Sequence, residues 1–329
     1  MEANVTGLIL ETQGEKGTGK GGRFVNLLIT GGTGFVGSAV VEQLLQRGDC
    51  IQIVSRNTKK KQEASLVQMP AAGALFSEKV IASLDGIINL AGESIAGSRW
   101  DATIRQRILN SRVAATSCIV DSIRRNQERG LPFPKVLVNA SAIGYYGTHP
   151  QQRFTESSGS GYGFLADVCR AWELEAIKGE SLGMRVVRLR LGHVLERDGG
   201  MLPRVATPFS FGMGGYLGDG QQWMSWIHRK DLVNIIIQAL DNGAWQGVYN
   251  ACTPYAVTMK EFMEVLGTTL GSKCRTRIPA LLARILFGEM AEEVLLKGQK
   301  VYPKRLLQQG YPFQYSQLSE ALADIYPRN

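Results

Sequence analysis

Three glycines stand three residues apart near the start of the chain, at Gly31, Gly34 and Gly37. A short apolar run over residues 27–29 precedes them, and an apolar pattern of helical period begins at Val36. In a strand–turn–helix unit, the first glycine permits a sharp turn and the second lets a phosphate approach the backbone. The third lets the helix pack closely on the sheet, and the free N–H groups of the helix N-terminus face the anion. Glycines also occur in ordinary loops, but their place between a strand and a helix predicts dinucleotide binding.

The next expected strand, residues 51–56, ends in Ser55 and Arg56. An acidic residue at this place would accept hydrogen bonds from the ribose 2′-hydroxyl, as in NAD sites. A hydroxyl and a guanidinium suit a 2′-phosphate instead. The alternative is that Lys59 and Lys60, which follow, are simply solvent-exposed charges. That alternative does not explain why no acidic residue stands at the end of the strand. The sequence therefore predicts NADP(H) as the cofactor.

Strand patterns alternate with helix patterns along the first two thirds of the chain. This alternation predicts an α/β fold, a Rossmann-type doubly wound parallel sheet whose ligands lie at the carboxyl ends of the strands. A smaller, partly helical substrate and C-terminal region is expected to follow. Strands are expected over residues 27–29, 51–56, 81–92, 135–140 and 185–191, and helices over residues 36–45, 102–125, 163–179 and 258–270.

The expected domain organisation has three parts. Residues 1–23 are predicted to be a flexible tail, although Gly14 and Gly19-Lys20 nearly complete a P-loop. That motif needs Ser or Thr at the next position, and Gly21 stands there instead. Residues 24–192, with parts of 223–251, are expected to form the NADP(H)-binding domain, and residues 193–222 and 252–329 the substrate-side and C-terminal region.

Composition narrows the functional classes. The chain has 329 residues and a net charge of +8, but its basic residues are scattered, which argues against nucleic-acid binding. No apolar run reaches the roughly 18–20 residues of a membrane span. The five cysteines form no CxxC pair, which favours free thiols and a cytoplasmic location. The three histidines are too far apart in sequence to suggest a metal site.

Several motifs together resemble the extended short-chain dehydrogenase/reductase superfamily: Thr30-Gly-Gly-Thr-Gly-Phe-Val-Gly37, Asn89-Leu-Ala-Gly92, and Ser141 after a mid-chain strand. More narrowly, the chain is similar to atypical epimerase family members, NAD-dependent epimerase/dehydratase-like proteins sometimes called SulA-like or cell-division-inhibitor-like, with their carboxyl-terminal extension domain. The narrower motifs are Ser141-Ala-Ile-Gly-Tyr-Tyr-Gly147, Arg190-Leu-Gly-His-Val-Leu195, Gly199-Gly-Met-Leu-Pro203, Phe211-Gly-Met-Gly-Gly215, Trp226-Ile-His228 with Asp231, and Val301-Tyr-Pro-Lys-Arg305.

The resemblance implies a set of cofactor-binding residues. Arg112 is included although many extended members carry a helical Asn there, which is a departure from the family pattern. The implied residues are Gly31, Gly34, Phe35, Val36 and Gly37 at the pyrophosphate, Ser55 and Arg56 at the 2′-phosphate, Leu90, Ala91 and Gly92 along the riboses, and Arg112, Ser141, His193 and Val194 toward the nicotinamide.

Catalysis departs further from the family. Reductases of the superfamily use a Tyr-x-x-x-Lys pair for proton transfer, and no tyrosine here has Lys four residues later. Ser141 could still hydrogen-bond a carbonyl, and Tyr145 is the nearest phenol. Without a lysine, Tyr145 is predicted to be a poor base at neutral pH, so any turnover would be slow and rise toward alkaline pH. A packing or lid role for Tyr145 is the alternative.

Two classes of function stay open. The first is an NADP(H)-dependent oxidoreductase or nucleotide-sugar-type epimerase with an unknown small substrate. The second is a cofactor-binding regulatory or interaction protein, for example in cell division, with a protein partner or as a homodimer. On the substrate side, the glycine-rich residues 212–220 suggest either a lid or packing turns. His228 is interpreted as a structural residue rather than a general base or metal ligand.

Overall fold

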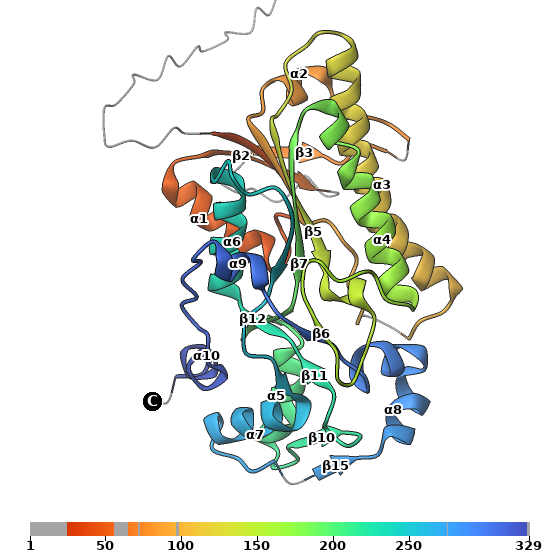
Figure 1. The fold of residues 1–329 in the computed structure, drawn as a ribbon, viewed down its shortest axis with the longest axis vertical. Helices are drawn as coiled ribbons and strands as arrows, with labels where there is room; N and C mark the ends of the chain where they lie inside the picture. The colour runs from red at the N-terminus through yellow and green to blue at the C-terminus, as the bar shows by residue number, and fades with distance from the viewer. Residues whose placement is uncertain (1–24, 56–64, 72, 97–98, 275, 328–329) are drawn as a thin grey trace, which may run out of the picture.

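The computed structural model describes residues 25–55, 65–71, 73–96, 99–274 and 276–327 (Figure 1). The tail expected over residues 1–23, with its near P-loop, lies outside the described residues, and so does Arg56.

A parallel sheet forms the upper half of the molecule in Figure 1. In the described part of the chain it has seven strands in the order β13-β7-β5-β4-β1-β2-β3, each parallel to its neighbours. The chain winds outward from β1 in both directions, which confirms the predicted doubly wound fold. The strands are β1 (Asn26–Thr30), β2 (Cys50–Ser55), β3 (Ser65–Gln68), β4 (Gly86–Asn89), β5 (Val136–Ala142), β7 (Arg185–Leu191) and β13 (Gly247–Ala251).

Helices cover both faces of this sheet because its strands are apolar on both sides. Leu27 and Ile29 of β1 pack in one core with α1 (Gly37–Arg47) and α6 (Arg229–Asp241). Leu28 points to the opposite face, because successive strand side chains alternate, and packs in a second core. On that face lie α2 (Glu78–Ala82), α3 (Ala102–Glu128) and α4 (Phe164–Ile177) (Figure 1).

The lower half of the molecule is a set of small sheets and helices around a separate core. Its paired strands are β12 (Trp226–His228), β8 (His193–Glu196) and β9 (Gly199–Gly200) in one sheet, β10 (Gly215–Leu217) with β15 (Thr276–Ile278), β11 (Trp223–Met224) with β14 (Val257–Thr258), and β6 (Arg153–Phe154) with β16 (Lys300–Val301). The helices outside the two main layers are α5 (Leu202–Ser210), α7 (Met259–Thr269), α8 (Ala280–Phe287), α9 (Lys304–Gln308) and α10 (Leu318–Ile325), with short turns η1 (Ile143–Tyr146), η2 (Glu180–Leu182) and η3 (Ala291–Leu295). The division into a cofactor domain and a substrate region stays a prediction.

Local signals account for the starts of α7 and α2. The sequence Thr258-Met-Lys-Glu261 predicts a capping box, and Thr258 and Glu261 form it at α7. The strand expected over residues 81–92 is shorter than predicted, because Ser77 caps a helix that includes Ile81, and β4 begins only at Gly86. The strand β3 was not predicted, since its four residues carry only a weak apolar pattern.

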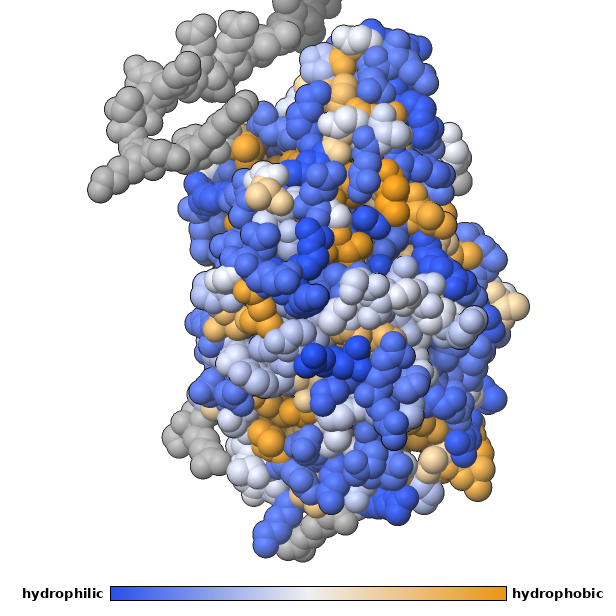
Figure 2. Space-filling view, in the orientation of Figure 1, coloured by the Kyte–Doolittle hydropathy of each residue, from blue (hydrophilic) through white to orange (hydrophobic). Residues whose placement is uncertain are grey.

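The helical pattern of residues 279–326, with Leu281, Leu282 and Ile285 among its apolar members, predicts mostly core positions, and the structure corrects this for α8. Leu281, Leu282 and Ile285 are 65%, 46% and 60% exposed, and apolar surface is visible at the lower right of Figure 2, where α8 lies. Periodicity alone cannot say which side of a helix another element covers. None of the helices described here combines the length and apolar character needed to cross a membrane.

Candidate functional site

The turn between β1 and α1 is built by close backbone contacts. Gly31 has a φ of +69°, and a Cβ placed on it would lie 2.6 Å from the carbonyl oxygen of Leu90. A Cβ on Gly37 would lie 2.1 Å from the carbonyl oxygen of Gly31. Gly34, by contrast, has only one neighbour, that same oxygen at 3.1 Å, so its other sides are open. No side chain caps the first N–H groups of α1. The turn is therefore an anion cradle of the expected kind.

A cavity of about 1030 Å³ opens from this turn across the carboxyl ends of β1, β4, β5 and β7. It brings together every predicted cofactor residue that the structure describes. These are Gly31, Gly34, Phe35, Val36, Gly37, Ser55, Leu90, Ala91, Gly92, Arg112, Ser141, His193 and Val194.

At the β2 end of the cavity, Ser55 lies with residues that the sequence did not indicate. Leu66 of β3, and Met69 and Pro70 just after it, line this end. They form an apolar wall beside the serine. The missed strand β3 is therefore part of the site.

Buried polar side chains join the strand ends beneath the cavity. The Thr30 hydroxyl donates to Asn89 Oδ1 at 2.5 Å, and Asn89 Nδ2 donates to Asn139 Oδ1 at 2.6 Å and to Thr116 Oγ1 at 2.8 Å. Trp172 Nε1 donates to the same threonine hydroxyl at 3.0 Å. This network ties β1, β4 and β5 to both α3 and α4, so it fixes the positions of the cavity walls.

The helix α4 turns an apolar face to the cavity. The lining side chains form two pairs four residues apart, Leu165 with Cys169 and Val168 with Trp172. A phenol and an amine at this spacing would be the proton relay of related reductases, and neither pair offers one. Burial raises the pKa of the Cys169 thiol to about 11, so it is neutral at physiological pH.

Ser141 lines the cavity, but its hydroxyl is engaged below the surface. It donates to Glu173 Oε1 at 2.7 Å, and Arg190 holds the same carboxylate through Nε at 2.7 Å and Nη2 at 2.9 Å. Arg190 Nη1 also donates to the Tyr146 hydroxyl at 2.9 Å, which in turn donates to Asn250 Oδ1 at 2.6 Å. All five residues are buried. We call them the Glu173–Arg190 network.

Tyr145 packs on that network instead of on the cavity. Its ring centroid lies 3.4 Å from the guanidinium carbon of Arg190, and its ring meets Tyr146 edge to face at 5.5 Å. Among the described residues that line the cavity, Tyr145 does not appear. The catalytic roles of Ser141 and Tyr145 stay predictions, and the position of Tyr145 favours the packing alternative.

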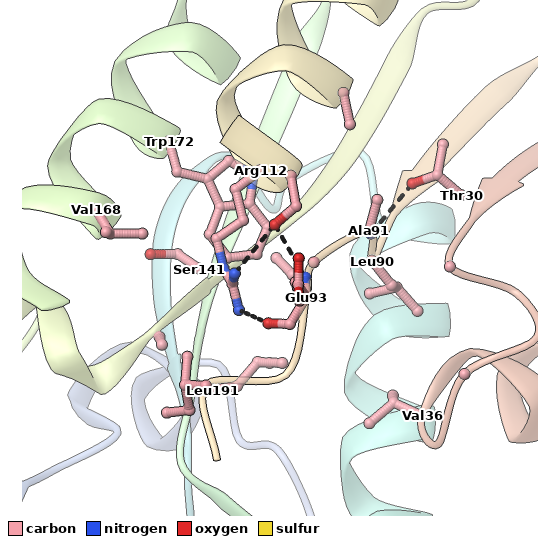
Figure 3. Close-up of a pocket in the computed structure, with 18 of the residues that line it drawn as sticks. Thr30, Val36, Leu90, Ala91, Glu93, Arg112, Ser141, Val168, Trp172 and Leu191 are labelled. Carbon is pink, nitrogen blue, oxygen red and sulfur yellow. Dashed lines mark hydrogen bonds between the residues drawn. The ribbon is translucent and has the colours of Figure 1, made fainter. Parts of the chain in front are cut away.

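Arg112 enters the cavity from α3, near Ser141 and Trp172 (Figure 3). Its Nη1 donates to the carbonyl oxygen of Ile108 at 2.9 Å, and its Nη2 donates to that of Glu93 at 3.0 Å. Figure 3 shows the guanidinium between α4 and the loop that follows β4. This position lies on the α4 side of the cavity, across β4 from the β1–α1 turn.

The cavity is covered by C-terminal residues that sequence reasoning missed. Val294, Lys297 and Gln299 line it, and the Glu293 carboxylate accepts hydrogen bonds from the N–H groups of Phe164 at 2.8 Å and Leu165 at 3.0 Å. Glu293 thus caps α4, which lacks a side-chain cap of its own.

Part of the glycine-rich stretch 212–220, for which the sequence suggested either a lid or packing turns, packs closely on its neighbours. A Cβ on Gly215 would lie 2.2 Å from the carbonyl oxygen of Thr276, because β10 lies against β15. No residue of that stretch lines the cavity among the residues described.

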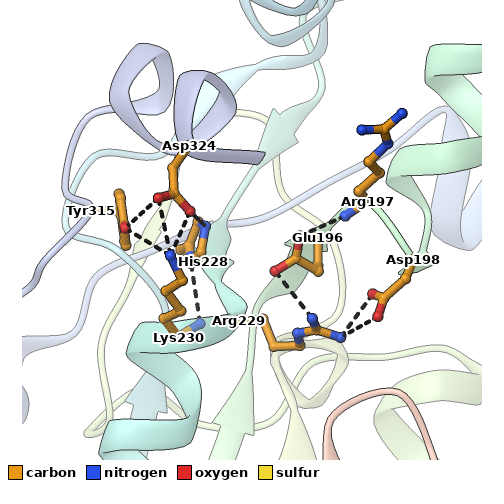
Figure 4. Close-up of polar contacts among 8 residues, drawn as sticks. All are labelled: Glu196, Arg197, Asp198, His228, Arg229, Lys230, Tyr315 and Asp324. Carbon is orange, nitrogen blue, oxygen red and sulfur yellow. Dashed lines mark hydrogen bonds and ion pairs between the residues drawn. The ribbon is translucent and has the colours of Figure 1, made fainter. Parts of the chain in front are cut away.

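The histidines have separate roles. Burial lowers the pKa of His193 to about 4, so its ring is neutral in the cavity wall. His228 is fully buried; its Nδ1 accepts from the Lys230 N–H at 3.1 Å and its ring stacks on Tyr315 at 4.0 Å (Figure 4). This matches the structural interpretation. The described residues contain no group of His, Cys, Asp and Glu placed to hold a metal.

The fold and the site define a class of protein: a nucleotide-binding α/β protein whose ligand lies where the strand order reverses. The family follows from comparison with known proteins. Residues 27–252 match the NAD dependent epimerase/dehydratase family, and residues 278–325 match a domain of unknown function, DUF1731. This chain belongs to the NAD dependent epimerase/dehydratase family.

Similar proteins span almost the same length. The chloroplastic epimerase family protein SDR39U1 homolog of Arabidopsis thaliana is 38% identical over 90% of this chain and 85% of its own. The epimerase family protein YfhF of Bacillus subtilis is 36% identical over 92% and 98%. Among solved structures, human epimerase family protein SDR39U1 (isoform 2) with NADPH has a TM-score of 0.79 at 30% identity, covering 92% of this chain and all of that one.

Proposed function

We propose that this chain binds NADP(H) in the cavity and acts as an oxidoreductase, or as a nucleotide-sugar-type epimerase, on a small substrate. The observation that carries the proposal is the glycine cradle opening into a single cavity that continues to Ser141 and His193. Its volume of about 1030 Å³ is at the upper end of the roughly 300–1,000 Å³ usual for ligand pockets. A dinucleotide and a small second molecule therefore fit.

The residues present suit the cofactor. The open sides of Gly34 and the uncapped N-terminus of α1 would hold the pyrophosphate. Ser55, at the end of β2, would face the adenosine ribose, and no acid stands there to repel a 2′-phosphate. The structure of human epimerase family protein SDR39U1 with NADPH supports the phosphorylated form. When bound, the cofactor supplies or accepts a hydride.

Transfer of label from the cofactor tests the oxidoreductase. We would incubate the protein with NADPH deuterated at nicotinamide C4 and a panel of small ketones, aldehydes and nucleotide sugars that carry a ketone, and follow deuterium in the products by mass spectrometry. Deuterium in one product class, absent with the Gly34→Val variant, is the expected result. If NADPH does not bind at all, the proposal fails.

A second candidate is a cofactor-binding regulatory protein with little catalysis. The apolar cavity face of α4 and the engagement of the Ser141 hydroxyl by Glu173 favour it. Its partner would be another protein or a second copy of this chain, and the exposed apolar side chains of α8 support such a contact. Free thiols at all five cysteines support a cytoplasmic location. Tight NADPH binding without label transfer across the panel would favour this candidate.

A further inference from the structure

Four charged side chains of the described residues line the cavity: two pair with an opposite charge, and a third accepts hydrogen bonds from backbone N–H groups. Glu93 pairs with Arg107 at 2.5 Å, and Lys297 lies 3.3 Å from Glu292. Glu293 accepts from the two N–H groups at the start of α4. The fourth is Arg112, and no carboxylate of the described residues forms an ion pair with it.

Arg112 is held in place without being neutralised. Its contacts are the carbonyl oxygens of Ile108 and Glu93 and, more weakly, the Ser111 hydroxyl at 3.4 Å. The guanidinium carbon lies 5.3 Å from the ring centroid of Trp172. A Cβ on Gly92 would lie 3.1 Å from that carbon, so the glycine lets the guanidinium lie against the backbone. These contacts fix its position but provide no negative charge.

The remaining donors of Arg112 are free to bind a ligand. A guanidinium has five N–H groups, and the contacts above leave the Nε–H and one further N–H without an acceptor among the described residues. Burial lowers the pKa of Arg112, and the nearby Glu93 carboxylate, which itself pairs with Arg107, offsets this only in part. A poorly solvated, unpaired cation in a cavity is stabilised by an anion that binds there.

The location separates this anion from the phosphates of the cofactor. The cradle for the pyrophosphate is at the end of β1, and Ser55 stands one strand further, at the end of β2. Arg112 lies on the other side, where the loop after β4 meets α3 and α4. Trp172 beside it belongs to the face of α4 on which related reductases carry their proton relay.

We propose that Arg112, which the family resemblance assigned to the nicotinamide side of the cofactor, instead binds a carboxylate of the substrate, so that the protein acts on small carboxylic acids. The inference rests on the proposed function, because it assumes that the rest of the cavity holds the cofactor. Two adjacent N–H groups of a guanidinium match the two oxygens of a carboxylate. Arg112 is a fixed positive charge that cannot itself exchange a proton near neutral pH. It orients the substrate against Ser141 and the apolar face of α4.

Malonate and its neutral diamide, malonamide, test the proposal on the full chain saturated with NADPH. Calorimetric titration compares the parent protein with Arg112→Met, Arg112→Lys and Arg124→Met. Arg124 is the matched control, since it lies on the same helix, is exposed and pairs with Asp121 away from the cavity. Circular dichroism confirms folding, and a separate titration gives the NADPH affinity of each variant.

We expect malonate to bind the parent protein more tightly than malonamide. Loss of one charge-assisted pair should weaken malonate binding about ten- to a hundredfold in Arg112→Met, and Arg112→Lys should lie between it and the parent. Arg124→Met should leave malonate binding unchanged, and all variants should bind NADPH as the parent does.

Three results would overturn the proposal. The first is that the parent protein binds malonate and malonamide equally. The second is that both Arg112 variants bind malonate as the parent does. The third is that Arg112→Met loses as much affinity for NADPH as for malonate. The last would assign Arg112 to the cofactor. If Arg112→Met does not fold, Arg112→Lys decides. Failure of the parent protein to bind NADPH would instead refute the proposed function.

Discussion

Two walls of one cavity differ in how far they follow the family pattern. The β1–α1 wall has its three glycines in the positions that the motif requires, with backbone atoms as close as 2.1 Å to an added Cβ. The α4 wall has apolar side chains where a phenol and an amine would stand. The cavity thus has the usual anion-binding turn on one side and lacks the usual tyrosine–lysine pair on the other.

Ser141 stands at the position that the family resemblance predicts, but its hydroxyl is used for support behind the second wall. Glu173 and Arg190 are both 3% exposed and hold each other through two hydrogen bonds. Ser141 is bonded to the same carboxylate. A polar residue at a family position therefore need not have the family's chemical role. The Ser141 hydroxyl already donates its proton to Glu173, and its hydrogen-bond partners decide which role it can have. The following variants test each wall separately.

The largest effect is expected from breaking the Glu173–Arg190 network. Replacing Arg190 with Met leaves the buried Glu173 carboxylate with only its longer contact to Arg188, at 3.6 Å, which should lower the free energy of unfolding by up to about 3–5 kcal/mol. Urea denaturation measures the loss. Lys178→Met is the control, because Lys178 pairs with Glu175 on the surface of the same helical segment, and it should change stability by less than about 1 kcal/mol. A small loss in Arg190→Met would show that the network does not support the fold.

The next largest effect is expected at the first wall. Gly34→Val places a branched side chain on the open side of the cradle, and NADPH binding should weaken at least about a hundredfold while the fold is retained. Fluorescence titration and circular dichroism measure the two properties. Gly243→Val, at an exposed glycine with no neighbour within 4 Å, is the control. Unchanged NADPH affinity in a folded Gly34→Val would remove the cradle from the cofactor site.

A smaller effect separates the two forms of the cofactor. The Ser55 and Arg56 pair predicts that NADPH binds more tightly than NADH by about ten- to a hundredfold, the loss of one charge-assisted contact of roughly 1.5–3 kcal/mol. Titration with both nucleotides measures the ratio, and Arg56→Ala should reduce it. Equal affinities for NADPH and NADH in the parent protein would contradict this reading of the β2 end.

The smallest effect is expected for Tyr145→Phe, which removes only the hydroxyl. The ring can still stack on Arg190, so stability should change by less than about 0.5 kcal/mol, and NADPH affinity should be unchanged. Any turnover found in the deuterium experiment should also persist. Loss of most turnover, or of its rise toward alkaline pH, would instead restore Tyr145 to the catalytic role that the sequence suggested.

Features that depend on neighbours along the chain could be predicted from the sequence. The glycine turn at Gly31 and Gly34, the capping box at Thr258, and the missing tyrosine–lysine pair are all visible within a few residues. The strand and helix alternation led to the doubly wound sheet, because periodicity reports which side of an element is buried. The family resemblance named the cofactor residues, and those that the structure describes line one cavity.

Contacts between groups far apart in the sequence could not be predicted and are visible only in the folded chain. Glu293 caps α4 although it lies 129 residues further along the chain. Arg190 binds the carboxylate of Glu173, which is 17 residues away in sequence, and Ser141 donates its hydroxyl proton to the same carboxylate. Arg112 differs from the other charged side chains of the described cavity lining, because each of those has a partner from a different part of the chain or from its own loop. Such pairings follow from packing between elements, because the energy that fixes them comes from contacts that no local stretch of sequence contains.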